Sequence, residues 1–238
     1  MRQTCDDLAA QGYVAVCPDL FWRIAPGLDL SDRTEAELAQ AQALYNAFDL
    51  DAGVSDIAAT VQATRAMPEV TGKIGVVGYC LGGLLAFLTA ARARPDATVA
   101  FYPGNADKHV READRIANPL IVHLAQKDEY IPADAQRQIA SELNRRPQVQ
   151  VYSYPGCGHA FARHRGTAYN AEAAAWPTAG PRISWPFICS RTETPDAPVA
   201  ATAFSSENRR TAFRGPSLDG VMLRLYDSPP NSPRSPGC

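Results

Sequence analysis

Residues 73–83 read Lys-Ile-Gly-Val-Val-Gly-Tyr-Cys-Leu-Gly-Gly, an apolar run that ends in a cysteine flanked by glycines. The run continues into the helix-forming residues 84–91. A buried strand that enters a helix through Gly-x-Cys-x-Gly is the pattern of a nucleophile elbow, with Cys80 in the place of the usual serine. Glycines suit such a sharp turn because a Cβ would strike neighbouring backbone. We therefore predict that Cys80 is a nucleophile; the alternative is a buried cysteine in a strand-to-helix turn.

The order of the elements indicates the fold class. Apolar stretches typical of strands lie near 13–17, 74–78, 97–102, 119–124 and 149–154, and helical patterns lie near 34–48, 52–66, 82–92 and 133–145. Strands that alternate with helices at this spacing predict βαβ units. We expect an α/β fold with a mostly parallel sheet flanked by helices. The helix after Cys80 would direct its N-terminal amides at the thiol and favour the thiolate.

A cysteine nucleophile needs a base, and the base needs an orienting group. In α/β-hydrolases these follow the nucleophile in the order acid and then histidine, on loops after later strands. Asp128 follows the apolar run 119–124, and His159 follows the run 149–154 within a glycine-containing loop. We therefore assign Asp128 as the acid and His159 as the base. Glu129 is the rival acid, but Asp128 lies closer to the strand end.

The remaining histidines and cysteines are weaker candidates. His123 lies inside an apolar strand, which is typical of a core histidine, whereas His109 and His164 have polar neighbours and are expected to face solvent. Cys157 lies two residues before His159, yet no second cysteine or histidine follows zinc-finger spacing, so we expect no metal site. The patterns around Cys5 and Cys17 are typical of small core side chains.

Composition limits the classes of partner. The chain has 238 residues and a formal net charge of −2, which gives no reason to expect nucleic acid or an anionic membrane as partner. The first residues have no apolar signal core, and no run approaches the length of a membrane span. Six cysteines without the spacing of a disulfide framework suit a reducing compartment. We expect a cytoplasmic monomer without a cofactor.

Several motifs in residues 1–175 resemble the dienelactone hydrolase (carboxymethylenebutenolidase) family. They are the Gln-Gly-Tyr-Val-Ala-Val-Cys-Pro-Asp-Leu run at 11–20, Ala-Phe-Asp at 47–49, the cysteine elbow, and Gly-His-Ala-Phe-Ala-Arg at 158–163. The resemblance implies an α/β-hydrolase fold with a Cys-Asp-His triad. It also implies hydrolysis of an enol-lactone, typically dienelactone to maleylacetate in chlorocatechol breakdown.

The resemblance implies further roles at the site. The backbone N–H of Leu81 would be one donor to the oxyanion. The substrate is a small anionic lactone, and Arg23 and Arg163 match the arginines that hold its carboxylate in the family. Tyr102 matches an aromatic residue of the family's pocket. The alternative for the arginines is a solvated surface position, and for Tyr102 it is core packing.

Both ends of the chain differ from the family pattern. Family members begin upstream of the position of Met1, and the upstream strands carry a glutamate that contacts the nucleophile and a second oxyanion donor. The expected fold is therefore incomplete at its N-terminus, with a partial hydrolase-like domain over residues 1–175.

The C-terminal segment has a different composition. Ten of the 19 prolines lie in residues 176–238, mixed with serine, arginine and threonine, and we expect this segment to be disordered. The codons that the genetic code allows for residues 176–187 could also encode an amphipathic helix if they were read in a neighbouring frame. Out-of-frame translation is therefore a second hypothesis for the segment. Two alternatives to a dienelactone hydrolase remain: a broader carboxylesterase or thioesterase with the same triad, and a catalytically inactive fragment.

Overall fold

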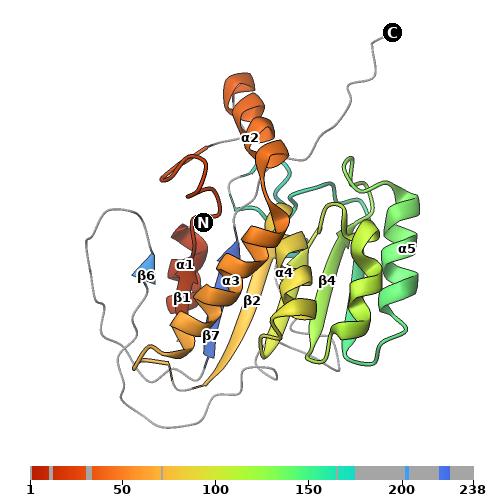
Figure 1. The fold of residues 1–238 in the computed structure, drawn as a ribbon. Coiled ribbons are helices and arrows are strands. Elements are labelled where there is room, and N and C mark those ends of the chain that lie inside the picture. Colours follow the sequence, from red (N-terminus) through yellow and green to blue (C-terminus); the bar gives the residue numbers. More distant parts are fainter. Residues whose placement is uncertain are drawn as a thin grey trace.

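A parallel sheet runs through the molecule. The computed structural model describes residues 2–10, 13–30, 34–70, 72–164, 166–174, 202–203 and 220–225. Within these residues the sheet has seven strands in the order β5-β4-β3-β2-β7-β1-β6 (Figure 1). The strands are β1 (Val14–Cys17), β2 (Lys73–Tyr79), β3 (Ala97–Phe101), β4 (Leu120–Ala125), β5 (Val149–Tyr154), β6 (Thr202–Ala203) and β7 (Gly220–Leu225).

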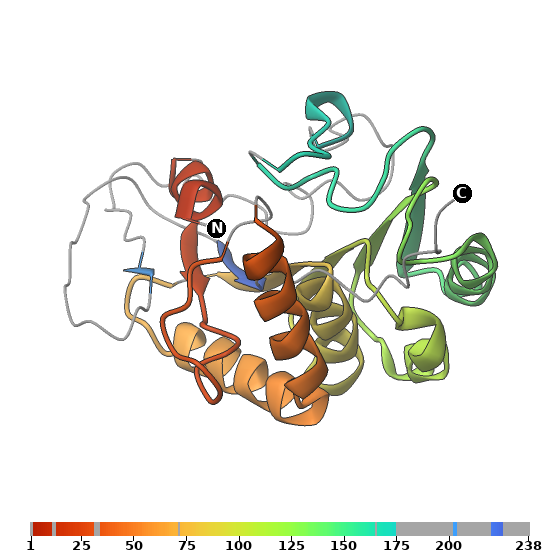
Figure 2. The same ribbon diagram turned by 90° about the horizontal axis from the view of Figure 1, so that it is seen from above.

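Helices cover both faces of the sheet. Figure 2 shows α3 on one face and α1 on the opposite face. The helices are α1 (Arg2–Ala9), α2 (Glu35–Ala47), α3 (Leu50–Arg65), α4 (Leu81–Arg92), α5 (Ala133–Leu143) and α6 (Ala171–Ala174), with a 3₁₀ helix η1 (Ala106–Arg115). The predicted α/β class is confirmed, and every strand and helix predicted by residue range is present with ends that agree within two residues. The sequence patterns did not predict η1, α6, β6 or β7.

Side-chain caps explain where two of these helices begin. The Thr34 hydroxyl accepts the Glu37 N–H and donates to the Glu37 carboxylate, a reciprocal arrangement at the start of α2. The Asp49 carboxylate accepts the N–H groups of Asp51 and Ala52 at the start of α3. The Asp49 cap lies in the turn between α2 and α3, and α2 stands beyond the upper ends of the strands (Figure 1).

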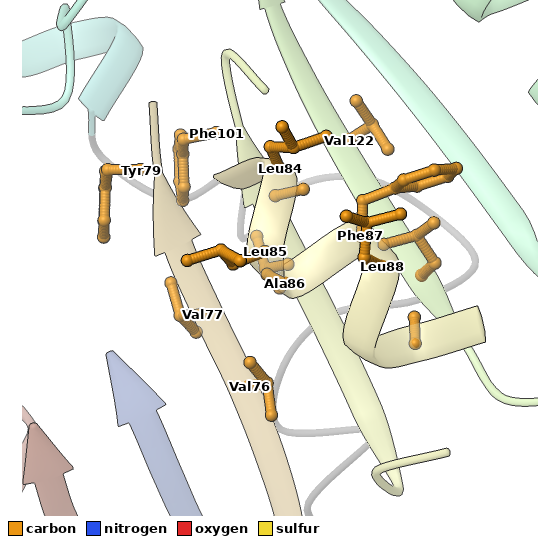
Figure 3. Packing of buried hydrophobic residues seen from close by; sticks show 14 of the residues in the cluster. Val76, Val77, Tyr79, Leu84, Leu85, Ala86, Phe87, Leu88, Phe101 and Val122 are labelled. Atoms are coloured by element: carbon orange, nitrogen blue, oxygen red, sulfur yellow. The ribbon is translucent and has the colours of Figure 1, made fainter. Parts of the chain in front are cut away.

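The core is centred on β2 and α4. Residues 74–91, which include the elbow, are buried without a break. Figure 3 shows side chains of β2 and α4 packed together with those of β3 and β4. A parallel strand covered on both faces is expected to read as a continuous apolar run, as β2 does. This buried unit holds the elbow in a rigid setting.

Four stacked side chains cross the sheet near the C-terminal ends of its strands. Tyr79, Phe101, His123 and Tyr152 are register partners on β2, β3, β4 and β5. Their ring centroids are 4.7, 4.3 and 5.7 Å apart in succession, with interplanar angles of 5°, 14° and 19°. Because all strands are parallel, the loops that follow them meet at this same edge.

Two short parts of the C-terminal segment lie in the sheet. β7 pairs in parallel with β2 over residues 220–225 and with β1 over residues 221–223, and β6 pairs with β1. The other residues of the segment that we expected to be disordered, 176–238, lie outside the described ranges.

Within the described ranges, no helix is both long enough and apolar enough to cross a bilayer.

Candidate active site

Cys80 lies between β2 and α4 in a strained backbone conformation. Its φ is 54° and its ψ is −116°, and only 2% of its surface is exposed. The Cys80 N–H donates to the Phe101 carbonyl at 3.1 Å, and its carbonyl accepts the Leu84 N–H at 3.0 Å. A non-glycine residue at positive φ persists only where the surrounding structure fixes it, and such residues are frequent at active sites.

Two glycines permit this turn. A Cβ on Gly78 would lie 1.8 Å from the Gly82 carbonyl oxygen, and a Cβ on Gly83 would lie 2.4 Å from the Phe101 carbonyl oxygen. Contacts under 3.0 Å with backbone cannot be relieved by moving a side chain. The glycines of the elbow are therefore required by close packing of α4 on β2 and β3.

His159 and Asp128 form a buried pair at the same edge of the sheet. Nδ1 of His159 lies 2.8 Å from Oδ2 and 3.0 Å from Oδ1 of Asp128. The Oδ1 atom also accepts the N–H groups of Tyr130 and Ile131 at 2.9 and 3.0 Å. Asp128 is 8% and His159 5% exposed. The carboxylate is thus fixed by its own loop and holds the imidazole so that Nε2 is left for another partner.

Cys80 acts on the same imidazole. Burial lowers the pKa of His159, but the charge of Cys80, hydrogen bonds with Asp128 and Cys80, and the charge of Asp128 together raise this pKa to about 10. An imidazole with this pKa is protonated at neutral pH, which favours the thiolate form of the cysteine beside it. The structure therefore brings the three predicted catalytic side chains together.

Glu129, the rival acid, has a different contact. Its Oε2 accepts the backbone N–H of His159 at 3.4 Å, and its side chain is exposed. Of the two neighbouring carboxylates, Asp128 contacts the imidazole and Glu129 contacts the main chain of the histidine loop. Ala160, the next residue of that loop, has a φ of 60°.

Two tyrosines enclose the His159 ring. Tyr102, a predicted pocket residue, is fully buried, has a φ of 35°, and lies 4.8 Å from the imidazole centroid. Tyr130 lies at the same distance with its ring at 80° to the imidazole. The sequence patterns did not identify Tyr130, although its position two residues after the assigned acid was a usable signal.

Leu81 is the first residue of α4, directly after Cys80. The first backbone hydrogen bond of this helix runs from Leu84 N–H to the Cys80 carbonyl. The amide groups of the preceding first turn have no acceptor inside an α-helix and are available to an anion. The Leu81 N–H therefore has the position expected of an oxyanion donor.

The two predicted carboxylate-binding arginines lie in different settings. Arg23 makes a two-pronged contact with Asp56, at 2.6 and 3.0 Å, and its guanidinium lies 4.3 Å from the Trp22 ring centroid. Its side chain is 50% exposed. Arg163 is half-buried in the turn that follows His159, where its N–H donates to the Ala160 carbonyl. Arg163 is thus joined to the histidine loop, whereas Arg23 is engaged with α3.

The other histidines have structural contacts. His123 is buried, and its Nδ1 lies 2.8 Å from the Tyr154 hydroxyl. Burial lowers the pKa of His123 to about 3, so the ring is neutral at physiological pH, which is consistent with the predicted core role. His164 is exposed near Asp7, whereas His109 is half-buried beside Glu112.

Among the described residues, the other cysteines and the acidic groups form no further site. Cys5 and Cys157 are buried, and Cys17 is partly exposed rather than fully in the core. Burial is the largest of the causes that raise the pKa of the Cys157 thiol. Among the described residues, no group of three or more histidine, cysteine, aspartate or glutamate side chains could hold a metal ion.

Comparison with known proteins identifies relatives over most of the chain. Residues 1–178 match the family described as "Dienelactone hydrolase family". A carboxymethylenebutenolidase of Pseudomonas putida is 41% identical over 175 residues, which cover 74% of each chain. Carboxymethylenebutenolidase 1 of Cupriavidus pinatubonensis is 37% identical over 182 residues and 76% of each chain. In fold, the chain is similar to the crystal structure of a proposed dienelactone hydrolase from Klebsiella pneumoniae, with a TM-score of 0.62, 23% identity, and coverage of 73% of this chain and 75% of that one.

Proposed function

Because the chain belongs to the dienelactone hydrolase family and is an ester-hydrolysing enzyme, we propose that it opens the enol-lactone ring of dienelactone to give maleylacetate. The observation that carries the proposal is the contact of His159 with Asp128 beside the strained Cys80 elbow. In this proposal the reaction belongs to the breakdown of chlorocatechols and takes place in the cytoplasm. The enzyme would act as a monomer and without a cofactor.

The first half-reaction acylates the cysteine. The Cys80 thiolate attacks the lactone carbonyl carbon, and negative charge develops on the carbonyl oxygen, which the Leu81 N–H would stabilise. The tetrahedral intermediate collapses to a thioester as the ring C–O bond breaks. The imidazolium of His159 gives its proton to the departing enolate, and Asp128 keeps the ring in its orientation throughout.

The second half-reaction releases the product. Neutral His159 takes a proton from a water molecule as its oxygen attacks the thioester carbonyl. The second tetrahedral intermediate expels the Cys80 thiolate, which restores the thiolate–imidazolium pair. The new carboxyl group loses its proton to solvent, so one water is consumed for each lactone opened.

We assign the binding of the substrate carboxylate to Arg163, because it follows the catalytic histidine in the same turn. A guanidinium can hold a carboxylate through two parallel hydrogen bonds, which an ammonium cannot reproduce. Arg23 would bind the substrate only by leaving Asp56. Arg163→Lys should therefore raise KM for dienelactone more than Arg23→Lys does.

The test is hydrolysis of cis- and trans-dienelactone by the full chain, beside the neutral ester p-nitrophenyl acetate. We expect a higher kcat/KM for a dienelactone than for the neutral ester, and loss of both activities in Cys80→Ala. A preference for neutral esters would indicate a broader carboxylesterase instead. Absence of all activity, or an undiminished rate in Cys80→Ala, would contradict the proposal.

A further inference from the structure

Tyr45 is held by a residue of the loop after β3. It lies near the end of α2, is half-buried, and its hydroxyl oxygen accepts a hydrogen bond from Nδ2 of Asn105 at 2.7 Å. The two residues are 60 positions apart in the chain. α2 stands beyond the upper ends of the strands in Figure 1, at the edge where the catalytic loops meet.

Asn105 belongs to the loop after β3, and this loop also contacts the catalytic histidine. Asn105 has a φ of 63° and a ψ of 11°, a left-handed conformation that asparagine adopts more readily than most residues. Tyr102, three residues earlier, donates its N–H to the His123 carbonyl at 2.7 Å and packs against the His159 ring. The loop from Tyr102 to Asn105 is therefore held at Tyr102, and Asn105 at its other end holds Tyr45.

The hydrogen bond from Asn105 determines what the Tyr45 hydroxyl can do. A phenol can accept and donate at once, and here its oxygen accepts from the amide. Its own hydrogen is therefore available for an acceptor elsewhere. Burial and the charge of Cys80 raise the pKa of Tyr45, against a smaller opposing effect of the Asn105 hydrogen bond. The hydroxyl thus remains protonated at neutral pH, and it lies within electrostatic reach of Cys80.

We propose that the Tyr45 hydroxyl, oriented by Asn105, donates a hydrogen bond to the carbonyl oxygen of the substrate as Cys80 attacks the carbonyl carbon. Tyr45 is then a catalytic residue, and Asn105 is the positioning residue behind it. The inference rests on the proposed function, since it assumes acylation of Cys80. The Leu81 amide and the Tyr45 hydroxyl would be the two donors to the same oxyanion.

The chemistry requires no proton transfer by Tyr45. As the S–C bond forms, the carbonyl π electrons move to the oxygen, and the hydrogen bond from Tyr45 strengthens with the growing charge. When the ring C–O bond breaks, the electron pair of the oxyanion re-forms the C=O bond and the negative charge leaves on the enolate oxygen, which His159 protonates. The hydrogen bond from Tyr45 then weakens. A donor of this kind lowers the barrier to acylation without tightening the binding of the ground state.

The test uses Tyr45→Phe, which keeps the ring and removes the hydroxyl. Asn105→Gly keeps the left-handed backbone and removes the amide, and Tyr169→Phe removes a hydroxyl from an exposed tyrosine outside the site. Steady-state turnover of dienelactone and the p-nitrophenolate burst with p-nitrophenyl acetate report hydrolysis and Cys80 acylation separately. Mass spectrometry of the Cys80 peptide identifies the acylated residue, and melting temperatures show whether each variant is folded.

In Tyr45→Phe we expect kcat and the burst rate to fall by about 10- to 100-fold, with KM within twofold of wild type. Asn105→Gly should show a smaller loss in the same parameters, and Tyr169→Phe should match wild type. A folded Tyr45→Phe variant with wild-type kcat and burst rate, or with a change in KM alone, would overturn the inference and leave the proposed function standing.

The two proposals can fail separately. A wild-type chain that is acylated at Cys80 but opens no lactone would contradict the proposed substrate, while the burst rate of Tyr45→Phe would still decide the role of Tyr45. A wild-type chain in which neither the lactone nor the ester acylates Cys80 would overturn both proposals.

Discussion

At the scale of single residues, burial disfavours a charged imidazole at position 159, yet the pKa of His159 is raised to about 10. The charge of Cys80, the hydrogen bonds with Asp128 and Cys80, and the charge of Asp128 outweigh the desolvation. Cys80 and Asp128, which belong to different loops, thus stabilise the charged form of His159. A charged imidazole would favour the thiolate form of Cys80, whose surface is only 2% exposed.

The reactivity of Cys80 should therefore depend little on pH near neutrality. We expect the rate of alkylation of Cys80 by iodoacetamide to be nearly flat from pH 6 to pH 8.5 in wild type, because the thiolate–imidazolium pair persists through this range. In His159→Gln the thiol should regain an ordinary pKa near 8.5, so the rate at pH 6 should fall roughly 100-fold.

Mass spectrometry of the Cys80 peptide provides the rate, and the Cys157 peptide is the internal control. The raised pKa of the Cys157 thiol predicts slow alkylation at neutral pH in both proteins. A Cys80 rate that rises tenfold per pH unit in wild type would contradict the charged pair.

His123 illustrates the opposite balance. Its native pKa is lowered to about 3 by burial, whereas an unfolded histidine titrates near 6.5. Below pH 6.5 the unfolded chain binds a proton that the native chain does not bind until about pH 3. The free energy of unfolding should therefore fall as the pH falls through this window, by up to about 1.4 kcal/mol per pH unit for one proton.

His123→Phe removes this titration and keeps a ring between Phe101 and Tyr152. The variant is expected to be less stable at pH 7, because the Tyr154 hydroxyl loses its partner. Its urea midpoint should nevertheless decline less steeply than that of wild type between pH 6.5 and pH 4. Parallel declines in the two proteins would show that His123 does not contribute to the acid sensitivity.

At the scale of elements, the elbow depends on the contact between α4 and β3. The sequence pattern predicted the strand, the turn and the helix, because glycine spacing and apolar periodicity are local properties. The partners of the elbow were harder to predict: the order of acid and histidine identified Asp128 and His159, but Tyr45 and Asn105 carry no motif. Their meeting depends on how α2 and the loop after β3 pack, which local patterns do not encode.

The same limit applies to Arg23. Its match to a carboxylate-binding arginine of the family predicted a substrate ligand, and only the fold reveals that Asp56, 33 residues later, lies against its guanidinium. Of the glycines in the loop of His159, Gly158 is not required by close packing, because a Cβ there would make only ordinary contacts at 3.6 and 3.7 Å. In this loop, Gly156 is the glycine that adopts a left-handed backbone conformation, with a φ of 77°.

Two glycines near the elbow offer a matched test of the α4–β3 contact. A Cβ on Gly83 would collide with the Phe101 carbonyl, whereas a Cβ on Gly104 would meet nothing within 4 Å. Gly83→Ala should lower the free energy of unfolding by about 2–4 kcal/mol and displace Cys80, with loss of activity. Gly104→Ala should change stability by less than about 0.5 kcal/mol. Equal urea midpoints for the two variants would contradict the close packing of α4 on β3.

At the scale of the whole molecule, the sheet joins distant parts of the chain. β2, which carries the elbow, has β3 on one side and β7 on the other, and β7 separates it from β1. The composition of residues 176–238 predicted no strand here. The six residues of β7 follow a long proline-rich stretch of sequence. A strand of six residues is stabilised mainly by the neighbouring strands with which it pairs, and only weakly by the propensity of its own residues.

Removal of β7 should therefore weaken the sheet at the strand that supports the nucleophile. A chain that ends at residue 218 loses the backbone pairing of β7 with β1 and β2, and this exposes the edges of both strands. We expect a lower melting temperature and a lower kcat than in the matched control, a chain that ends at residue 225 and keeps β7. The two truncations differ only by residues 219–225, so a difference between them reports on β7 and not on the rest of the C-terminal segment. If both truncated chains melt at the same temperature and hydrolyse ester at the same rate, β7 contributes nothing to the sheet, and the elbow is supported by β3 and α4 alone.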